Sequence, residues 1–205
     1  MNLFVSGIGT NVGKTIVAAV LTEALQADYW KPIQSGTIEG KDSDTVRSLI
    51  SNTHTCVHPE TYLLREPLSP HFAAKLEGTE IDFTYINPPL TGNTLIIEGA
   101  GGLLVPINSH QFVVDLARKF HCEIVLVISN YLGCINHSLL SIDYLIRNNY
   151  KIHSLIFNGA FEPEVKNAIA NYASDCQIIH LPTLKNLEKS EIRAVAAHIK
   201  QQMTL

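Results

Sequence analysis

Basic charge, long apolar runs and paired cysteines are all scarce in this sequence. The 15 Lys and Arg residues are outnumbered by 19 Asp and Glu residues, the formal net charge is −4, and the basic residues form no stripe. A protein of this charge is not expected to bind nucleic acid. No apolar stretch reaches the roughly 18 residues that cross a bilayer, and no basic region precedes the apolar N-terminal residues. We therefore expect a cytoplasmic protein with no membrane partner.

The four cysteines are scattered along the chain, and no two of them have the Cys-x-x-Cys spacing. Because a chain of this size does not need disulfides to fold, we expect free thiols. His54, Cys56 and His58 alternate, so they can present three metal ligands from one side of an extended segment. No fourth ligand follows with the spacing of a zinc site, and an ordinary polar loop is the favoured interpretation.

Short β-branched and apolar runs alternate with stretches of helical periodicity. The runs that predict strands cover residues 3–6, 29–33, 94–97, 123–129, 153–157 and 177–180. The helical stretches cover residues 14–26, 42–51, 111–120, 134–148, 162–173 and 188–201, and the Pro-rich region 52–93 allows a short helix at 71–76. Continuous apolar strands between helices are typical of a parallel sheet covered on both faces. We expect an α/β protein with a doubly wound, mostly parallel sheet, and a hydrophobic content of 46% fits one domain, residues 1–205.

A glycine-rich turn runs from Val5 and ends in Gly13, Lys14 and Thr15. Glycines allow successive backbone N–H groups to point into one hollow, and the helix that follows adds partial positive charge there. Lys14 can neutralise the outer phosphates, and the Thr15 hydroxyl can hold Mg²⁺. The spacing departs from the usual pattern, because five residues separate Gly7 from Gly13. The segment still predicts a phosphate loop that binds a nucleoside triphosphate, in a fold of the phosphate-loop NTPase kind.

Ligands of an open parallel sheet bind beyond the carboxyl ends of its strands, so polar residues after each predicted strand are candidates. Lys31 and Ser35 follow the second strand, and Lys31 either neutralises charge during phosphoryl transfer or is a solvated surface lysine. Asp44 either reaches a metal ion or caps a helix. Glu98 ends the third strand before glycine-rich residues that also fit an ordinary turn. Together Thr15, Asp44 and Glu98 offer oxygen ligands of the kind that Mg²⁺ prefers.

A helix is predicted to begin at Gly133, just past a buried strand. Its free N–H groups can receive an anion such as a carboxylate. Cys134 has no neighbouring base in the sequence and is interpreted as a packing residue rather than a nucleophile. His137 is interpreted as a residue that forms hydrogen bonds on the helix rather than as an acid or base.

Six motifs occur in the order seen in dethiobiotin synthetases, and the chain resembles that family over residues 3–160. The motifs are Gly-Ile-Gly-Thr-Asn-Val-Gly-Lys-Thr, Lys-Pro-Ile-Gln-Ser-Gly, Asp-Ser-Asp, Pro-Leu-Ser-Pro-His, Glu-Gly-Ala-Gly-Gly and Leu-Gly-Cys-Ile-Asn-His. The resemblance implies a doubly wound homodimer that uses ATP and Mg²⁺ to convert diaminopelargonic acid and CO2 to dethiobiotin, in biotin biosynthesis. The implied route passes through a carbamate and a carbamic-phosphoric anhydride, and releases ADP and phosphate.

The resemblance also assigns roles to residues. Lys31 and Lys14 are the implied catalytic residues, and Thr15, Asp44 and Glu98 are the implied ligands of magnesium. The implied nucleotide-binding residues are Asn11, Val12, Gly13, Lys14, Thr15, Ile16, Asp44, Glu98, Gly99, Ala100, Gly101, Asn158, Gly159, Leu181, Pro182 and Asn186, with Asn158 reading the adenine and Leu181 and Pro182 flanking it. The implied substrate-binding residues are Thr10, Ser35, Gly133, Cys134, Ile135 and Asn136, the last four receiving the carboxylate tail of a substrate bound to the other subunit.

Three residues depart from the pattern that this family commonly shows. Asn11 stands where a glutamate is common, so one carboxylate near the magnesium and the amines is missing. Tyr131 stands where a lysine is often found, and Asn186 stands where an acidic nucleotide-binding residue is expected. The match is also thinner beyond residue 160, so together with Asn186 it leaves the nucleotide preference open.

Two other classes of protein use a similar loop. ATP-switched partitioning and septum-placement proteins carry a second lysine early in the loop, where this chain has Ile8, and many end in a basic amphipathic helix that the segment 199–205 does not resemble. Amide-forming synthetases that act on cobyrinic-acid-type substrates normally add a glutamine-hydrolysing domain, and a chain of 205 residues has no room for one. The sequence therefore favours the dethiobiotin synthetase interpretation.

Overall fold

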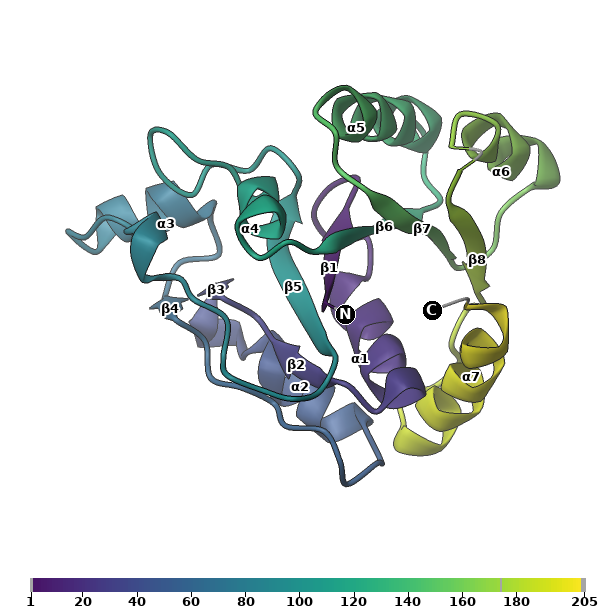
Figure 1. The fold of residues 1–205 in the computed structure, drawn as a ribbon, viewed down its shortest axis with the longest axis horizontal. Coiled ribbons are helices and arrows are strands. Elements are labelled where there is room, and N and C mark those ends of the chain that lie inside the picture. Colours follow the sequence, from purple (N-terminus) through teal and green to yellow (C-terminus); the bar gives the residue numbers. More distant parts are fainter. Residues whose placement is uncertain (1, 174, 204–205) are drawn as a thin grey trace.

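A six-stranded sheet forms the centre of the protein. The computed structural model describes residues 2–173 and 175–203, and its strands lie in the order β2-β5-β1-β6-β7-β8 (Figure 1). Every described pairing in this sheet is parallel. The strand bounds are β1 Asn2–Gly7, β2 Asp28–Trp30, β5 Leu95–Gly102, β6 Glu123–Ser129, β7 Ile152–Asn158 and β8 Gln177–Leu181. The predicted parallel sheet is confirmed.

Helices cover both faces of the sheet. Helices α1, α2 and α7 pack together on one face, and α4, α5 and α6 lie on the other (Figure 1). Their bounds are α1 Lys14–Leu25, α2 Asp42–Leu49, α4 Val113–Lys119, α5 Cys134–Arg147, α6 Pro163–Ala170 and α7 Lys189–Gln202. A strand with a helix on each side can expose neither face, which is why the interiors of β1, β6 and β7 are buried throughout. The doubly wound architecture is confirmed.

The predicted strand 29–33 is wrong in one respect, because the structure divides it. β2 ends at Trp30, and a separate strand β3 (Ile33–Ser35) pairs with β4 (Tyr62–Leu64) in a small second sheet. Pro32 lies at the division; it has no N–H to give to a sheet ladder. The chain therefore leaves the main sheet at Lys31.

The predicted strand 94–97 is too short. β5 runs to Gly102, so Glu98 lies inside the strand and not at its end, opposite Val5 of β1. The glycine-rich residues 99–102, for which an ordinary turn is the alternative interpretation, belong to β5, although its ladder with β1 shifts register between Val5 and Gly7 and Gly101 has a φ of +68°. The predicted short helix is confirmed as α3 (Pro70–Leu76), and two 3-10 turns, Thr37–Glu39 and Phe83–Tyr85, complete the irregular region.

The segment that contains His54, Cys56 and His58 runs along the outer edge of β2. The Tyr29 N–H donates to the carbonyl of Cys56, the His58 N–H donates to the carbonyl of Tyr29, and the His58 ring contacts the Asp28 carboxylate at 3.1 Å. Within residues 2–173 and 175–203, no group of three His, Cys, Asp or Glu side chains is arranged to hold a metal ion. The segment is a polar edge of the sheet, in line with the favoured interpretation.

All four cysteines are free thiols, as predicted. None of the helices in the described part of the chain is long and apolar enough to span a membrane. The terminal residues 204 and 205, part of the segment compared above with amphipathic anchors, lie outside the described residues.

Candidate active site

The loop between β1 and α1 is tight and is fixed at both ends. The N–H of Ile8 donates to the carbonyl of Val127 in β6 at 3.1 Å. Gly13 has a φ of +89°, and a Cβ there would lie 2.1 Å from the Asn158 side-chain nitrogen, so only glycine fits. The Asn158 amide in turn donates to the carbonyl of Val12 at 3.0 Å. The loop thus has the shape of a phosphate cradle, and β7 supports it from behind.

Lys14 lies at the end of this loop, and no carboxylate among the described side chains forms an ion pair with it. Its ammonium donates to the carbonyl of Gly9 at 3.0 Å. Burial lowers the pKa of Lys14 to about 8, and the neighbouring Lys31 acts in the same direction, whereas Glu98 opposes the shift. An anion in the loop would supply the negative charge that this ammonium lacks.

Glu98 is the hub of the site. Its side chain is 1% exposed, and it accepts hydrogen bonds from the Thr15 hydroxyl at 2.9 Å, the Tyr29 hydroxyl at 2.8 Å and the Lys31 ammonium at 2.9 Å. The three donors come from α1, β2 and the residue after β2. Because a buried carboxylate is costly unless it is hydrogen-bonded, this network holds Glu98 in one position.

Lys31 is a buried ion-paired lysine, so its interpretation as a solvated surface lysine is wrong. Its ammonium lies 2.9 Å from Glu98 and 2.5 Å from the Asp42 carboxylate. Burial alone would lower the pKa of Lys31, but the carboxylates of Glu98 and Asp42 outweigh burial and raise it. Lys31 therefore carries its positive charge next to the phosphate loop at any physiological pH.

Sequence reasoning singled out Asp44 as a metal ligand, which stays a prediction, and missed Asp42 as the partner of Lys31. Asp44 lines the same cleft, but its carboxylate is exposed and pairs with Arg47 at 2.6 Å and Lys41 at 3.8 Å. Residues two positions apart on a helix point about 200° apart, so Asp42 and Asp44 cannot face Lys31 together. The backbone N–H of Asp42 donates to Gln34 at 3.0 Å, which fixes the helix start that turns Asp42 inward. The only sequence signal was the pair of carboxylates itself.

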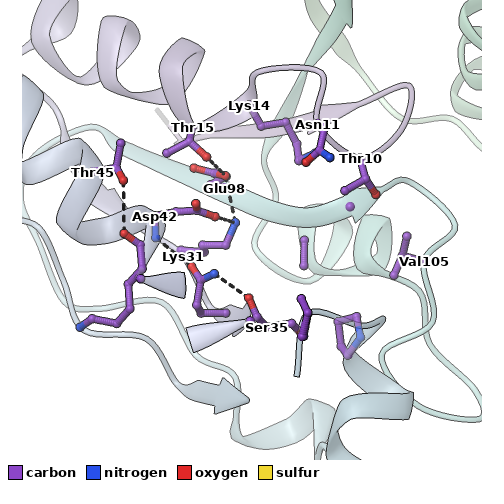
Figure 2. A pocket seen from close by; sticks show the side chains of 18 of the residues that line it. Thr10, Asn11, Lys14, Thr15, Lys31, Ser35, Asp42, Thr45, Glu98 and Val105 are labelled. Atoms are coloured by element: carbon purple, nitrogen blue, oxygen red, sulfur yellow. Dashed lines mark hydrogen bonds and ion pairs between the residues drawn. The ribbon is translucent and has the colours of Figure 1, made fainter. Parts of the chain in front are cut away.

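One elongated cleft of about 950 Å³ joins these groups. Figure 2 shows Thr10, Asn11 and Lys14 along one wall, the network around Glu98 in the middle and Ser35 on the opposite wall. The sequence-predicted residues that line it are Thr10, Asn11, Gly13, Lys14, Thr15, Ile16, Lys31, Ser35, Asp44, Glu98, Ala100 and Gly101. The wall near Ser35 is completed by residues 67–70, the first four residues of the Pro-Leu-Ser-Pro-His motif.

The remaining predicted nucleotide residues lie behind or beside the loop. Asn158 contacts the loop backbone as described above, and the N–H of Gly159 donates to Leu181 at 2.9 Å, so the ends of β7 and β8 are joined. Pro182 and Asn186 are exposed in the segment that follows β8. Gly99 is buried between Phe4 and Val113, so it faces the core and not the cleft.

The start of α5 lies outside the lining of this cleft. Cys134 is 3% exposed, in agreement with a packing role. The Tyr131 hydroxyl and His137 Nδ1 are 2.7 Å apart, which confirms that His137 forms a hydrogen bond on the helix. Gly133 and Asn136 are exposed and Ile135 is partly buried, so the first turn of α5 is open to a ligand or a partner.

Comparison with known proteins gives the family. A family model described as "AAA domain" matches residues 1–191. An ATP-dependent dethiobiotin synthetase of Cytophaga hutchinsonii is 44% identical over 96% of this chain and 95% of its own length. The corresponding protein of Agrobacterium fabrum is 37% identical over 97% and 94%. The chain belongs to the dethiobiotin synthetase family.

Solved structures resemble this family member in fold alone. The septum site-determining protein MinD of Pyrococcus horikoshii, solved with Mg-ADP, has a TM-score of 0.52 and 13% identity over 96% of this chain and 95% of its own. A ParA-family ATPase of Chlorobium tepidum has a TM-score of 0.50 and 14% identity over 96% and 98%. The sequence relatives of the dethiobiotin synthetase family disfavour the alternative of a partitioning or septum-placement protein.

The lowered pKa of Lys14 predicts that nucleotide binding depends on pH. Above about pH 8 the free loop lysine is largely neutral, whereas a bound triphosphate favours its charged form, so binding takes up a proton. Between pH 7.5 and 9.5 the ATP affinity should fall about tenfold or more. Calorimetry in two buffers of different ionisation enthalpy measures the uptake at pH 8.5. Lys14→Arg, which stays charged, is the control, and binding without proton uptake would contradict the prediction.

Proposed function

We propose that this protein is an ATP-dependent dethiobiotin synthetase, which joins CO2 and diaminopelargonic acid and closes the ureido ring at the expense of ATP. The observation that carries the proposal is Lys31. A buried, permanently charged ammonium stands between two carboxylates, beside a phosphate loop, in a chain whose relatives bear this name. Use of ATP, a cytoplasmic metabolite, supports a cytoplasmic location.

The proposed reaction has three steps. One amine of the substrate attacks CO2 and loses a proton, which gives a carbamate. A carbamate oxygen then attacks the γ-phosphorus of ATP and releases ADP, and the second amine attacks the carbamate carbon and releases phosphate. Lys14 and Lys31 approach the cleft from two sides, so they can neutralise the charge on the phosphoryl group and on the carbamate during these steps. The protein contributes placement and charge.

The residues present fit a bound Mg²⁺. Thr15 and Glu98 contact each other directly, and both offer oxygen atoms to the cleft, where ATP phosphate oxygens would complete the ligand set. Bound magnesium would neutralise charge on the phosphates. The third protein ligand is proposed to be Asp44, which lines the cleft but must exchange its Arg47 partner for the ion.

Asn158 and Ser35 are proposed to contact the adenine and the substrate, because each has polar atoms available for further hydrogen bonds. The Asn158 amide uses one N–H on Val12, and its oxygen and second N–H are available to read a base. The Ser35 hydroxyl oxygen is buried at the cleft wall and has no hydrogen-bond partner among the described residues, so it is suited to bind substrate.

Replacing Lys31 tests the proposed function. The purified protein should incorporate labelled bicarbonate into dethiobiotin when diaminopelargonate, ATP and Mg²⁺ are present. Lys31→Met should reduce kcat about a hundredfold or more, equivalent to roughly 2.7 kcal/mol, because the charge that develops loses its counter-charge. Lys151→Met, at an exposed lysine outside the cleft lining, is the control and should retain most activity. A wild-type protein that forms no labelled product would overturn the proposal, and an active Lys31→Met would remove this lysine from the mechanism.

Replacing Asp44 and replacing Asp42 should have different effects if Asp44 is the metal ligand. Asp44→Asn should raise the Mg²⁺ concentration needed for half-maximal activity about tenfold or more, because a charged ligand is lost. Asp42→Asn should change that concentration little and should instead reduce kcat, since one of the two carboxylates that hold Lys31 is removed. Activity measured against Mg²⁺ concentration for both variants distinguishes the two residues. The reverse pattern would assign the metal to Asp42.

The protein is proposed to act as a homodimer. The first turn of α5 is open, lies outside the cleft lining and is flanked by Leu132, which is 104% exposed, and Leu140, which is 62% exposed. Residues 133–136 can therefore receive the carboxylate tail of a substrate held mainly by a second subunit. Sedimentation equilibrium should give twice the chain mass of 22.6 kDa. A species of single-chain mass in the active preparation would contradict a dimer.

A further inference from the structure

Tyr29 lies directly behind Glu98 and is absent from every role described so far. Its ring is fully buried, and its hydroxyl donates to Glu98 Oε2 at 2.8 Å. The other carboxylate oxygen, Oε1, accepts from Thr15 and Lys31, both of which line the cleft, whereas Tyr29 does not. The two oxygens of Glu98 therefore have different surroundings, one toward the cleft and one toward the core.

We infer that Tyr29 is a positioning residue, which ties back Oε2 of Glu98 so that Oε1 faces Thr15 and a bound divalent cation. The inference rests on the proposed function, because it assigns Glu98 to the metal site. A ligand carboxylate is oriented by the hydrogen bonds of its outer oxygen, and loss of such a partner commonly weakens metal binding.

The sheet register explains why Tyr29 reaches this oxygen. Tyr29 of β2 pairs with Ile96 of β5, and Glu98 follows Ile96 by two residues, so the two polar side chains project from the same face of the sheet. Lys31 follows Tyr29 by two residues and turns to the same side. Trp30, between them, faces the opposite layer, where its ring packs against Phe120 at 5.6 Å.

Hydrogen bonds on both sides of Tyr29 keep its backbone in place. β5 pairs with it on one side, and on the other its N–H donates to Cys56 at 2.9 Å while its carbonyl accepts from His58 at 2.8 Å. The preceding residue, Asp28, is a buried carboxylate that accepts from the N–H of Cys56 at 2.9 Å and from Thr91 at 2.7 Å. The backbone from which the Tyr29 side chain projects is therefore held in place. A residue that orients another side chain needs such a rigid position.

The hydroxyl is also a permanent donor. Burial, reinforced by the adjacent Glu98 carboxylate, raises the pKa of Tyr29 well above its ordinary value. Without this donor Oε2 would be a buried carboxylate oxygen with no partner, and rotation of the carboxylate toward Thr15 and Lys31 would be the available relief.

Tyr29→Phe removes the hydroxyl and keeps the ring. Tyr150→Phe is the matched control, because Tyr150 is also buried and its hydroxyl donates to a carboxylate, Asp115, at 3.1 Å, and neither residue lines the cleft. Binding of Mn²⁺ in the presence of ADP is measured by electron paramagnetic resonance, and ADP binding without metal is measured by calorimetry. Denaturant unfolding of each variant reports on stability.

The expected result is a loss of Mn²⁺ affinity of about tenfold or more in Tyr29→Phe, with metal-free ADP affinity within about twofold of wild type. Tyr150→Phe should keep its Mn²⁺ affinity even if it loses as much stability as Tyr29→Phe. Unchanged Mn²⁺ affinity in Tyr29→Phe, or an equal loss in both variants, would overturn the positioning role.

These measurements do not depend on dethiobiotin formation. A wild-type protein that binds Mn²⁺ with ADP and loses that binding in Tyr29→Phe, yet makes no labelled dethiobiotin, would retain the role of Tyr29 and overturn the proposed function. A wild-type protein that binds no Mn²⁺ with ADP would overturn the role of Tyr29 itself.

Discussion

The site depends on one buried carboxylate. Glu98 is inside a strand, almost without solvent contact, and three donors from three different segments converge on it. A charge in such a position is tolerated only when its hydrogen bonds are made, so α1, β2 and the residue after β2 must all be in place for the carboxylate to keep its hydrogen bonds. The same contacts that satisfy Glu98 therefore fix the relative positions of Thr15 and Lys31 at the cleft.

The strand order makes this convergence possible. β5 lies between β2 and β1 although it follows both by many residues in the chain. Parallel pairing directs the carboxyl ends of all three strands to one edge of the sheet, where the phosphate loop leaves β1 and Lys31 follows β2. The break at Pro32 then takes the chain out of the main sheet into β3, which carries Ser35 to the opposite wall of the cleft. One proline thus separates the phosphate side from the proposed substrate side.

The sequence predicted those features that depend on local pattern. Apolar strand runs, helix periodicity and the turn ending at Lys14 and Thr15 each carry their signal within a few residues, and the structure confirms them. It did not predict that β5 runs past Glu98, because glycines are poor strand formers by themselves, and the strand continues here through a register shift to the pairing of Gly102 with Gly7. Asp42 and Tyr29 were missed for a related reason. Which of two nearby carboxylates faces inward, and which tyrosine stands behind Glu98, depends on helix start and cross-strand register.

The pKa values of the two cleft lysines, Lys14 and Lys31, shift in opposite directions, which shows how charge is arranged in the cleft. Both ammonium groups are buried, but Lys31 has two carboxylate partners and a raised pKa, whereas Lys14, within the described part of the chain, donates to a backbone carbonyl alone and has a pKa lowered to about 8. The difference is not one of burial, since burial lowers the pKa of both. It reflects the counter-charge that the protein supplies to Lys31 and withholds from Lys14. A loop of backbone N–H groups around an ammonium without a carboxylate is electrostatically incomplete until a polyanion enters it, and this imbalance gives the loop its preference for phosphates.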